Sequence, residues 1–77
     1  MKKGFVIQVD GIEYVIALCT PTKSGNVAIL LRRSGNRECL TVSNLKPDIK
    51  GKYSWELGYP AESYDDAVNK FMTRVTA

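Results

Sequence analysis

The chain of 77 residues contains no histidine, and this absence removes several kinds of active site. Without histidine, the chain has neither a zinc site built from cysteine and histidine nor a serine or cysteine nucleophile activated by a neighbouring imidazole. Its two cysteines, Cys19 and Cys39, cannot alone complete a tetrahedral structural metal site. We expect two reduced thiols, buried as small apolar side chains, rather than a disulfide framework.

Other catalytic signatures are also missing. The glycines at predicted turns stand singly, so no glycine-rich loop is available to hold a phosphate. The only adjacent carboxylates, Asp65 and Asp66, would project about 100° apart on a helix, so they do not converge as an acid pair. The sequence therefore predicts a protein that is not an enzyme and that uses no cofactor and no metal.

Long apolar runs are absent as well. The longest extends only over residues 14–19, far short of the roughly 20 residues that cross a bilayer. The start, Met1-Lys2-Lys3, is like that of a signal peptide, but Gln8, Asp10 and Glu13 interrupt the segment that would have to be apolar. We expect one small cytoplasmic domain spanning residues 1–77.

The sequence does contain a clear β-hairpin signal near its start. Two apolar runs, residues 5–9 and 12–18, flank Asp10-Gly11, and a type I′ turn needs residues that accept positive φ at both central positions. This turn pairs Val9 with Ile12 and places alternate residues on a common face. That face carries Phe5, Ile7, Val9, Ile12, Tyr14, Ile16 and Leu18. The opposite face carries Val6, Gln8, Glu13, Val15, Ala17 and Cys19.

A second hairpin is predicted in the middle of the chain. Residues 27–31 are apolar on both faces, which indicates a central strand. With Gly35-Asn36 as a two-residue loop, the predicted cross-strand pairs are Arg33 with Glu38, Leu31 with Leu40 and Ile29 with Val42. Residues 20–25 and 44–48 are predicted to be loops, because each combines proline with turn-forming residues.

The last third of the chain predicts a short strand and a helix. Residues 53–57 alternate as a strand does, and Gly58 and Pro60 are expected to end it. Ser63 and Asp66 resemble a capping box, and apolar residues then recur at helical spacing over residues 64–75. We expect this helix to cover the face with Ile7 and Tyr14. The predicted fold is α+β: an antiparallel meander of four to five strands followed by one C-terminal helix.

Two surfaces are candidates for binding a partner. The chain has a net charge of +3, and within residues 21–53 lysine and arginine outnumber aspartate and glutamate. Guanidinium groups at a hairpin tip can hold phosphates or acidic protein surfaces. This basic group comprises Arg32, Arg33, Arg37 and Lys23; its alternative role is a solvated edge that resists aggregation. The apolar back face of the sheet comprises Val6, Val15, Ala17 and Leu30. One helix covers one face, so this side either curls onto itself or packs on another chain.

A third candidate is the aromatic group Tyr53, Trp55 and Tyr59. Beside Lys50 and Lys52, these rings could stack on single-stranded bases, or they could close the core against the helix. The leading hypothesis is a non-catalytic domain that binds another protein or its own copy, as small phage or bacterial inhibitors and adaptors do. The alternative is a nucleic-acid binding module that uses residues 21–53. No membrane partner is predicted.

Overall fold

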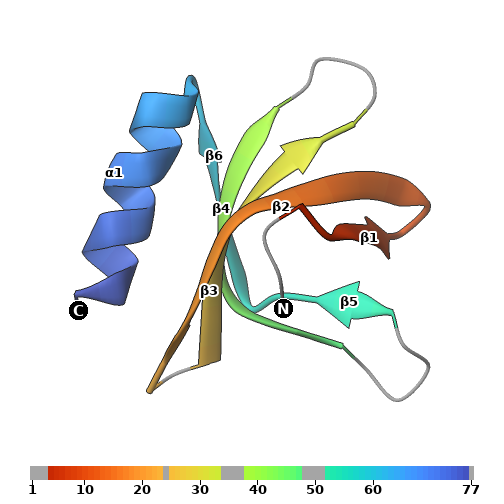
Figure 1. The fold of residues 1–77 in the computed structure, drawn as a ribbon, viewed down its shortest axis with the longest axis horizontal. Helices are drawn as coiled ribbons and strands as arrows, with labels where there is room; N and C mark the ends of the chain where they lie inside the picture. Colours follow the sequence, from red (N-terminus) through yellow and green to blue (C-terminus); the bar gives the residue numbers. More distant parts are fainter. Residues whose placement is uncertain (1–3, 24, 34–37, 48–51, 77) are drawn as a thin grey trace.

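The computed structural model describes residues 4–23, 25–33, 38–47 and 52–76. As predicted, it is an antiparallel sheet followed by one C-terminal helix (Figure 1). The elements are β1 (Val6–Val9), β2 (Ile12–Thr22), β3 (Gly25–Arg32), β4 (Cys39–Pro47), β5 (Tyr53–Ser54), β6 (Leu57–Ala61) and α1 (Tyr64–Val75). The strand order is β1-β2-β3-β4-β5, and β6 also pairs with β4. No helix in the described part of the chain is long and apolar enough to cross a membrane.

The β1–β2 hairpin has the predicted turn and register. Asp10 and Gly11 have φ of 51° and 81°, which are the positive values that a type I′ turn requires. Val9 lies opposite Ile12 and Ile7 lies opposite Tyr14. The local turn chemistry alone was enough to determine this part of the sheet.

The predicted register between β3 and β4 is wrong by one residue. Leu31 lies opposite Cys39 rather than Leu40, and the Arg32 amide, not that of Arg33, donates to the Glu38 carbonyl at 3.0 Å. Both strands carry apolar residues on both faces, so the hydrophobic pattern does not distinguish two registers that differ by one residue. The predicted Gly35-Asn36 loop lies outside the described residues.

The described residues of the two segments predicted as loops, apart from Lys23, extend the strands instead. β2 continues through Pro21, which pairs with Asn26 of β3 at a position that β1 does not reach. The proline is tolerated because it lies on an open edge of the sheet. β4 continues to Pro47 through a bulge, where the register shifts and Asn44 has a positive φ of 55°. This bulge bends β4, so that its first half pairs with β6 and its last residues pair with β5.

The strand predicted over residues 53–57 is split in two. β5 ends at Ser54, and β6 begins at Leu57 and passes through Gly58 and Pro60, which had been expected to end a strand. Within the described residues β6 pairs with β4 alone, and an edge strand tolerates proline. At Gly58 the absence of a Cβ matters, because a Cβ there would lie 3.1 Å from the Trp55 indole nitrogen.

The helix has the predicted bounds but covers the other face of the sheet. Between the helix and the sheet lies one core cluster, formed by Val27 and Ile29 of β3 and Ala67 and Phe71 of α1. The face predicted to meet the helix instead forms the inside of the curled sheet, with Ile7, Ile16, Ala28, Leu30, Val42 and Leu45. The bulges in β2 and β4 curl the sheet toward this face, and α1 packs on the convex side (Figure 1).

Aromatic rings close the inside of the curl. The ring of Phe5 lies 6.4 Å from that of Tyr53, and the ring of Tyr14 meets Trp55 edge-on at 5.8 Å. Such ring pairs add to the apolar surface that is buried on the inner face of the sheet. The sheet therefore buries both faces, one by curling and one beneath α1.

Candidate functional site

Arg33 stands just after β3, at the end of the sheet remote from the β2–β3 turn. Its Nη1 lies 3.8 Å from Glu13 Oε1, and both side chains are about half exposed. Its backbone N–H also donates to the Glu13 carbonyl at 3.1 Å. Arg33 is thus paired across to β2, and the predicted pair with Glu38 is wrong.

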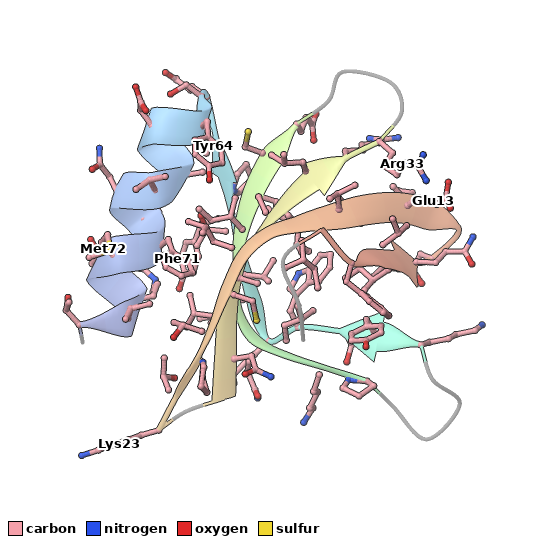
Figure 2. The ribbon with its side chains drawn as sticks, in the orientation of Figure 1. Glu13, Lys23, Arg33, Tyr64, Phe71 and Met72 are labelled. Atoms are coloured by element: carbon pink, nitrogen blue, oxygen red, sulfur yellow. The ribbon has the colours of Figure 1, made fainter. Side chains whose placement is uncertain are left out.

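The structure does not assemble the predicted basic group as one site. Arg32 lies opposite Tyr14 on the inner face of the sheet, whereas Arg33 follows it in the chain. The Nε atom of Arg32 is buried and has no hydrogen-bond partner among the residues that the structure describes. Lys23 lies at the opposite end of the sheet from Arg33 (Figure 2). Arg37 is outside the described residues.

An apolar row crosses the outer face of the sheet beside α1. Val6 lies opposite Val15, and Val15 lies opposite Leu31. Leu31 packs against the cluster under the helix, Val15 is partly buried, and Val6 is 40% exposed. We call these three residues the apolar shelf. Leu31 was missed from the sequence because Leu30, which points to the opposite face of β3, was assigned to the back face in its place.

Two residues of the predicted back face do not belong to this shelf. Leu30 is fully buried inside the curled sheet, so it is not available to a partner, and its prediction as an interface residue is wrong. Ala17 stands at the β2 bulge and packs against the cluster under α1. Of the predicted apolar surface, Val6 and Val15 remain.

A shallow cavity of about 390 Å³ lies on the shelf and is lined by Val15, Leu31, Arg32 and Arg33. The ion pair between Arg33 and Glu13 lies at its border. Protein–protein interfaces likewise have an apolar centre, which loses its water on binding, and a polar rim.

The three candidate aromatic residues fall into two separate places. Tyr53 and Trp55 pack against the inner cluster. Tyr59 pairs with Thr41 on the helix side, where the Arg74 guanidinium lies 3.9 Å from the centre of its ring. The rings therefore do not form one stacking platform, and only Tyr59 contributes to closure against the helix.

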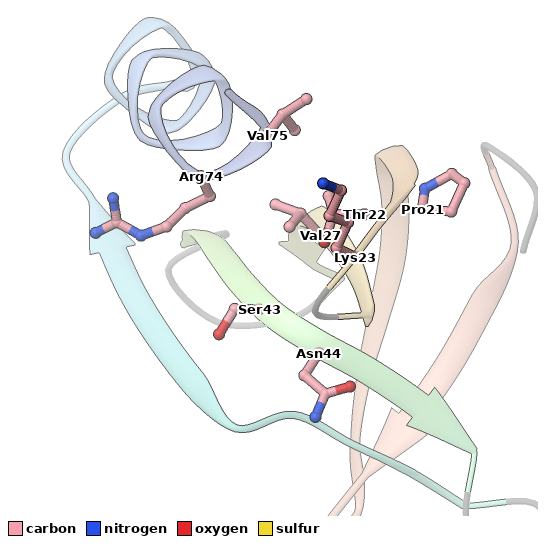
Figure 3. Close-up of a pocket in the computed structure, with 8 residues that line it drawn as sticks. All are labelled: Pro21, Thr22, Lys23, Val27, Ser43, Asn44, Arg74 and Val75. Carbon is pink, nitrogen blue, oxygen red and sulfur yellow. The ribbon is translucent and has the colours of Figure 1, made fainter. Parts of the chain in front are cut away.

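A second open cavity, of about 750 Å³, lies between the end of α1 and the β2–β3 turn (Figure 3). Its lining includes Lys23, Ser43, Asn44 and Arg74. The two cations do not converge, because Arg74 extends over β6 toward the ring of Tyr59, away from Lys23. The arrangement does not present a focused site for an anion.

The two thiols are unpaired and lie on opposite faces of the sheet. Cys19 packs against the inner cluster and Cys39 against the cluster under α1. Both are partly buried, so they are less buried than the sequence predicted. Burial raises the pKa of the Cys19 thiol, which makes it a poorer nucleophile. Among the described residues, no three side chains gather to bind a metal ion.

Comparisons of the chain with protein-family models, with curated proteins and with solved structures gave no match.

Proposed function

We propose that the protein is a small, non-catalytic domain that binds another protein through the apolar shelf. The observation that carries this proposal is the row of Val6, Val15 and Leu31, which continues the core beneath α1 onto a surface that the helix leaves uncovered. Apolar surface at the centre of a contact supplies binding energy when it leaves water.

The charged border of the shelf supports a protein partner over nucleic acid. The guanidinium of Arg33 already pairs with Glu13, which lowers the local positive field. A nucleic-acid site needs several unpaired cations along a backbone track, commonly with aromatic rings that stack on bases. Here Lys23 lies at the far end of the sheet and the aromatic residues are divided between its two faces.

The test is affinity capture with the full chain from cells of its source, with the captured protein identified by mass spectrometry and then purified. Val15→Glu places a charge on the shelf, and Asn69→Glu places the same charge on the exposed side of α1 as a control. We expect the first variant to lose at least about tenfold in affinity for the purified partner and the second to retain it. Equal affinity of both variants would contradict the proposal.

Salt dependence separates this proposal from the nucleic-acid alternative. Binding through apolar surface persists as salt rises toward about 1 M, where electrostatic contacts are screened within about 3 Å. Phosphate binding weakens steeply over the same range. If the captured partner is a second copy, light scattering will show a dimer that Val15→Glu converts to monomer.

A further inference from the structure

The edge of β1 bears unpaired peptide groups beside the apolar shelf. In the observed register, Val9 and Ile12 flank a two-residue turn and so exchange hydrogen bonds. The bonds alternate from there, and the Ile16 amide donates to the Phe5 carbonyl at 2.9 Å as this alternation requires. The N–H and C=O groups of Val6 and Gln8 consequently point away from β2.

Nothing in the described part of the chain pairs with that edge. Within those residues, β1 is bonded to β2 alone, and the peptide groups of Val6 and Gln8 have no partner. β5 approaches β1 through the contact between Phe5 and Tyr53, but the two strands are not paired. An unpaired strand edge is a template for a further strand.

An open groove runs along this edge. Its volume is about 570 Å³, and it is lined by Phe5, Val6, Ile7, Gln8, Asp10, Gly11, Lys52 and Tyr53. Phe5 is 48% exposed and Val6 40% exposed, so a strand lying here would cover apolar surface as well as complete hydrogen bonds. The residue of such a strand that lies opposite Val6 would add one position to the row of the apolar shelf.

We infer that the β1 edge binds an extended, mainly apolar segment of the partner by strand addition. The inference rests on the proposed function, because Val6 contributes its side chain to the shelf and its peptide group to the free edge. The unpaired N–H and C=O groups specify the backbone conformation of the occupant, and the shelf specifies apolar side chains at alternate positions.

A partner segment fits this edge better than a symmetric pairing of two β1 strands. β1 has four residues, and its outer edge offers the peptide groups of only two of them. The area that so short a contact would bury is far smaller than the roughly 1,200 Å² that stable protein interfaces bury. A segment carried by a protein that also covers the shelf adds both contacts to one interface.

The probe is a displayed library of random peptides about ten residues long, which is the upper range of strand length, selected against the immobilised full chain. A selected peptide is then made in two forms, methylated on the backbone nitrogens of either its odd or its even residues. Strand addition uses only alternate N–H groups of the peptide, so one form should bind at least about tenfold more weakly and the other should retain its affinity. Equal effects of the two forms, or a library that yields no binder, would overturn the inference.

A protein variant tests the same contact from the other side. Gln8→Pro removes an outward N–H and none of the hydrogen bonds between β1 and β2, so we expect a folded chain, checked by circular dichroism, with at least about tenfold weaker peptide binding. If Gln8→Pro unfolds the chain, the methylated peptides still decide the question.

Val15→Glu separates this inference from the proposed function. A peptide lost with Val15→Glu but unaffected by Gln8→Pro would overturn strand addition and leave the shelf as the binding surface. A concentration-dependent dimer that Gln8→Pro abolishes would place a second copy on the edge and also overturn the inference. If Val15→Glu does not weaken binding of the captured partner, the proposed function itself fails.

Discussion

Gly25 and Asn44 meet at the β2–β3 turn, where two strands bend at once. Gly25 has a φ of +115° and Asn44 a φ of +55°, both in the region that side chains disfavour. A Cβ on Gly25 would overlap Asn44 Oδ1 and lie 3.2 Å from Asn44 Cα. Gly25 is therefore required both for its backbone conformation and for the space that it leaves to the β4 bulge.

Substituting Gly25 should cost more than substituting a glycine that is only conformationally required. Gly11 has a φ of +81° and no heavy atom within 4 Å of the position of a Cβ. Gly11→Ala should destabilise by the left-handed penalty of about 1–2 kcal/mol, and Gly25→Ala by more, since the overlap with Asn44 adds to that penalty. Urea unfolding of both variants measures the difference. Equal losses of stability would show that β4 shifts freely to accommodate the methyl group.

Thr41 joins the sheet to the helix. It is fully buried in β4, and its Oγ1 donates to the Ala67 carbonyl of α1 at 2.9 Å. Thr41→Val keeps the shape but removes the donor, and we expect a loss of about 1 kcal/mol. Thr73→Val is the matched control, because it removes a hydroxyl bond to a helix carbonyl, that of Asn69 at 2.9 Å, on the exposed side. A buried variant no less stable than wild type would contradict the role of this bond.

At the scale of the element, the start of α1 is held by reciprocal bonds. The Asp66 amide donates to Ser63 Oγ at 3.1 Å, which is the predicted cap. The Asp66 carboxylate accepts from the Glu62 amide at 3.1 Å, one residue before the position that a capping box uses, and from Lys70 Nζ at 2.6 Å. These two bonds, that from Lys70 above all, hold the pKa of Asp66 below its ordinary 3.8.

The depressed pKa of Asp66 makes the helix sensitive to acid. Because the carboxylate is favoured in the folded state, its contribution is present above pH 3.8 and is lost as the pH falls through the lower folded value. Asp66→Asn should remove part of the stability lost on acidification, whereas Asp65→Asn controls for a negative charge near the helix N-terminus. Urea unfolding between about pH 2 and pH 6 checks this. Parallel pH profiles for wild type and Asp66→Asn would contradict it.

Local chemistry predicted the elements whose determinants lie close together in the chain. The Asp10-Gly11 turn sets the register of the first hairpin, and the Ser63 cap sets the start of the helix. The register of β3 against β4 and the face covered by α1 depend on contacts between distant segments. Because β3 is apolar on both faces, its sequence is compatible with either register against β4 and with a helix on either face.

The same limit applies to the candidate site. Val6 and Val15 could be placed together because they pair across two strands that one tight turn joins. Leu31 could not be joined to them, because its position depends on where β3 pairs with β2 across a bulge. Strands that continue through Pro21 and Pro60 were missed because both prolines lie on open edges, a property of the sheet rather than of the local sequence.

At the scale of the whole molecule, one sheet separates two small cores. The radius of gyration is 11.4 Å, close to the roughly 11.5 Å expected of a compact domain of this length. The chain thus reaches normal compactness by itself, and its shelf and β1 edge are additional surfaces rather than gaps in the core. Binding there is expected to add stability that rises with the logarithm of partner concentration once this exceeds Kd.

Hydrogen exchange at β1, followed by nuclear magnetic resonance, tests the central claim most directly. The claim is that this strand has one bonded edge and one open edge, so adjacent amides should differ. We predict that the amides of Val6 and Gln8 exchange rapidly and those of Ile7 and Val9 slowly. On binding a selected peptide, Val6 and Gln8 should become protected. Equal protection of all four amides in the free protein, or no added protection at Val6 and Gln8 on binding, would contradict the account.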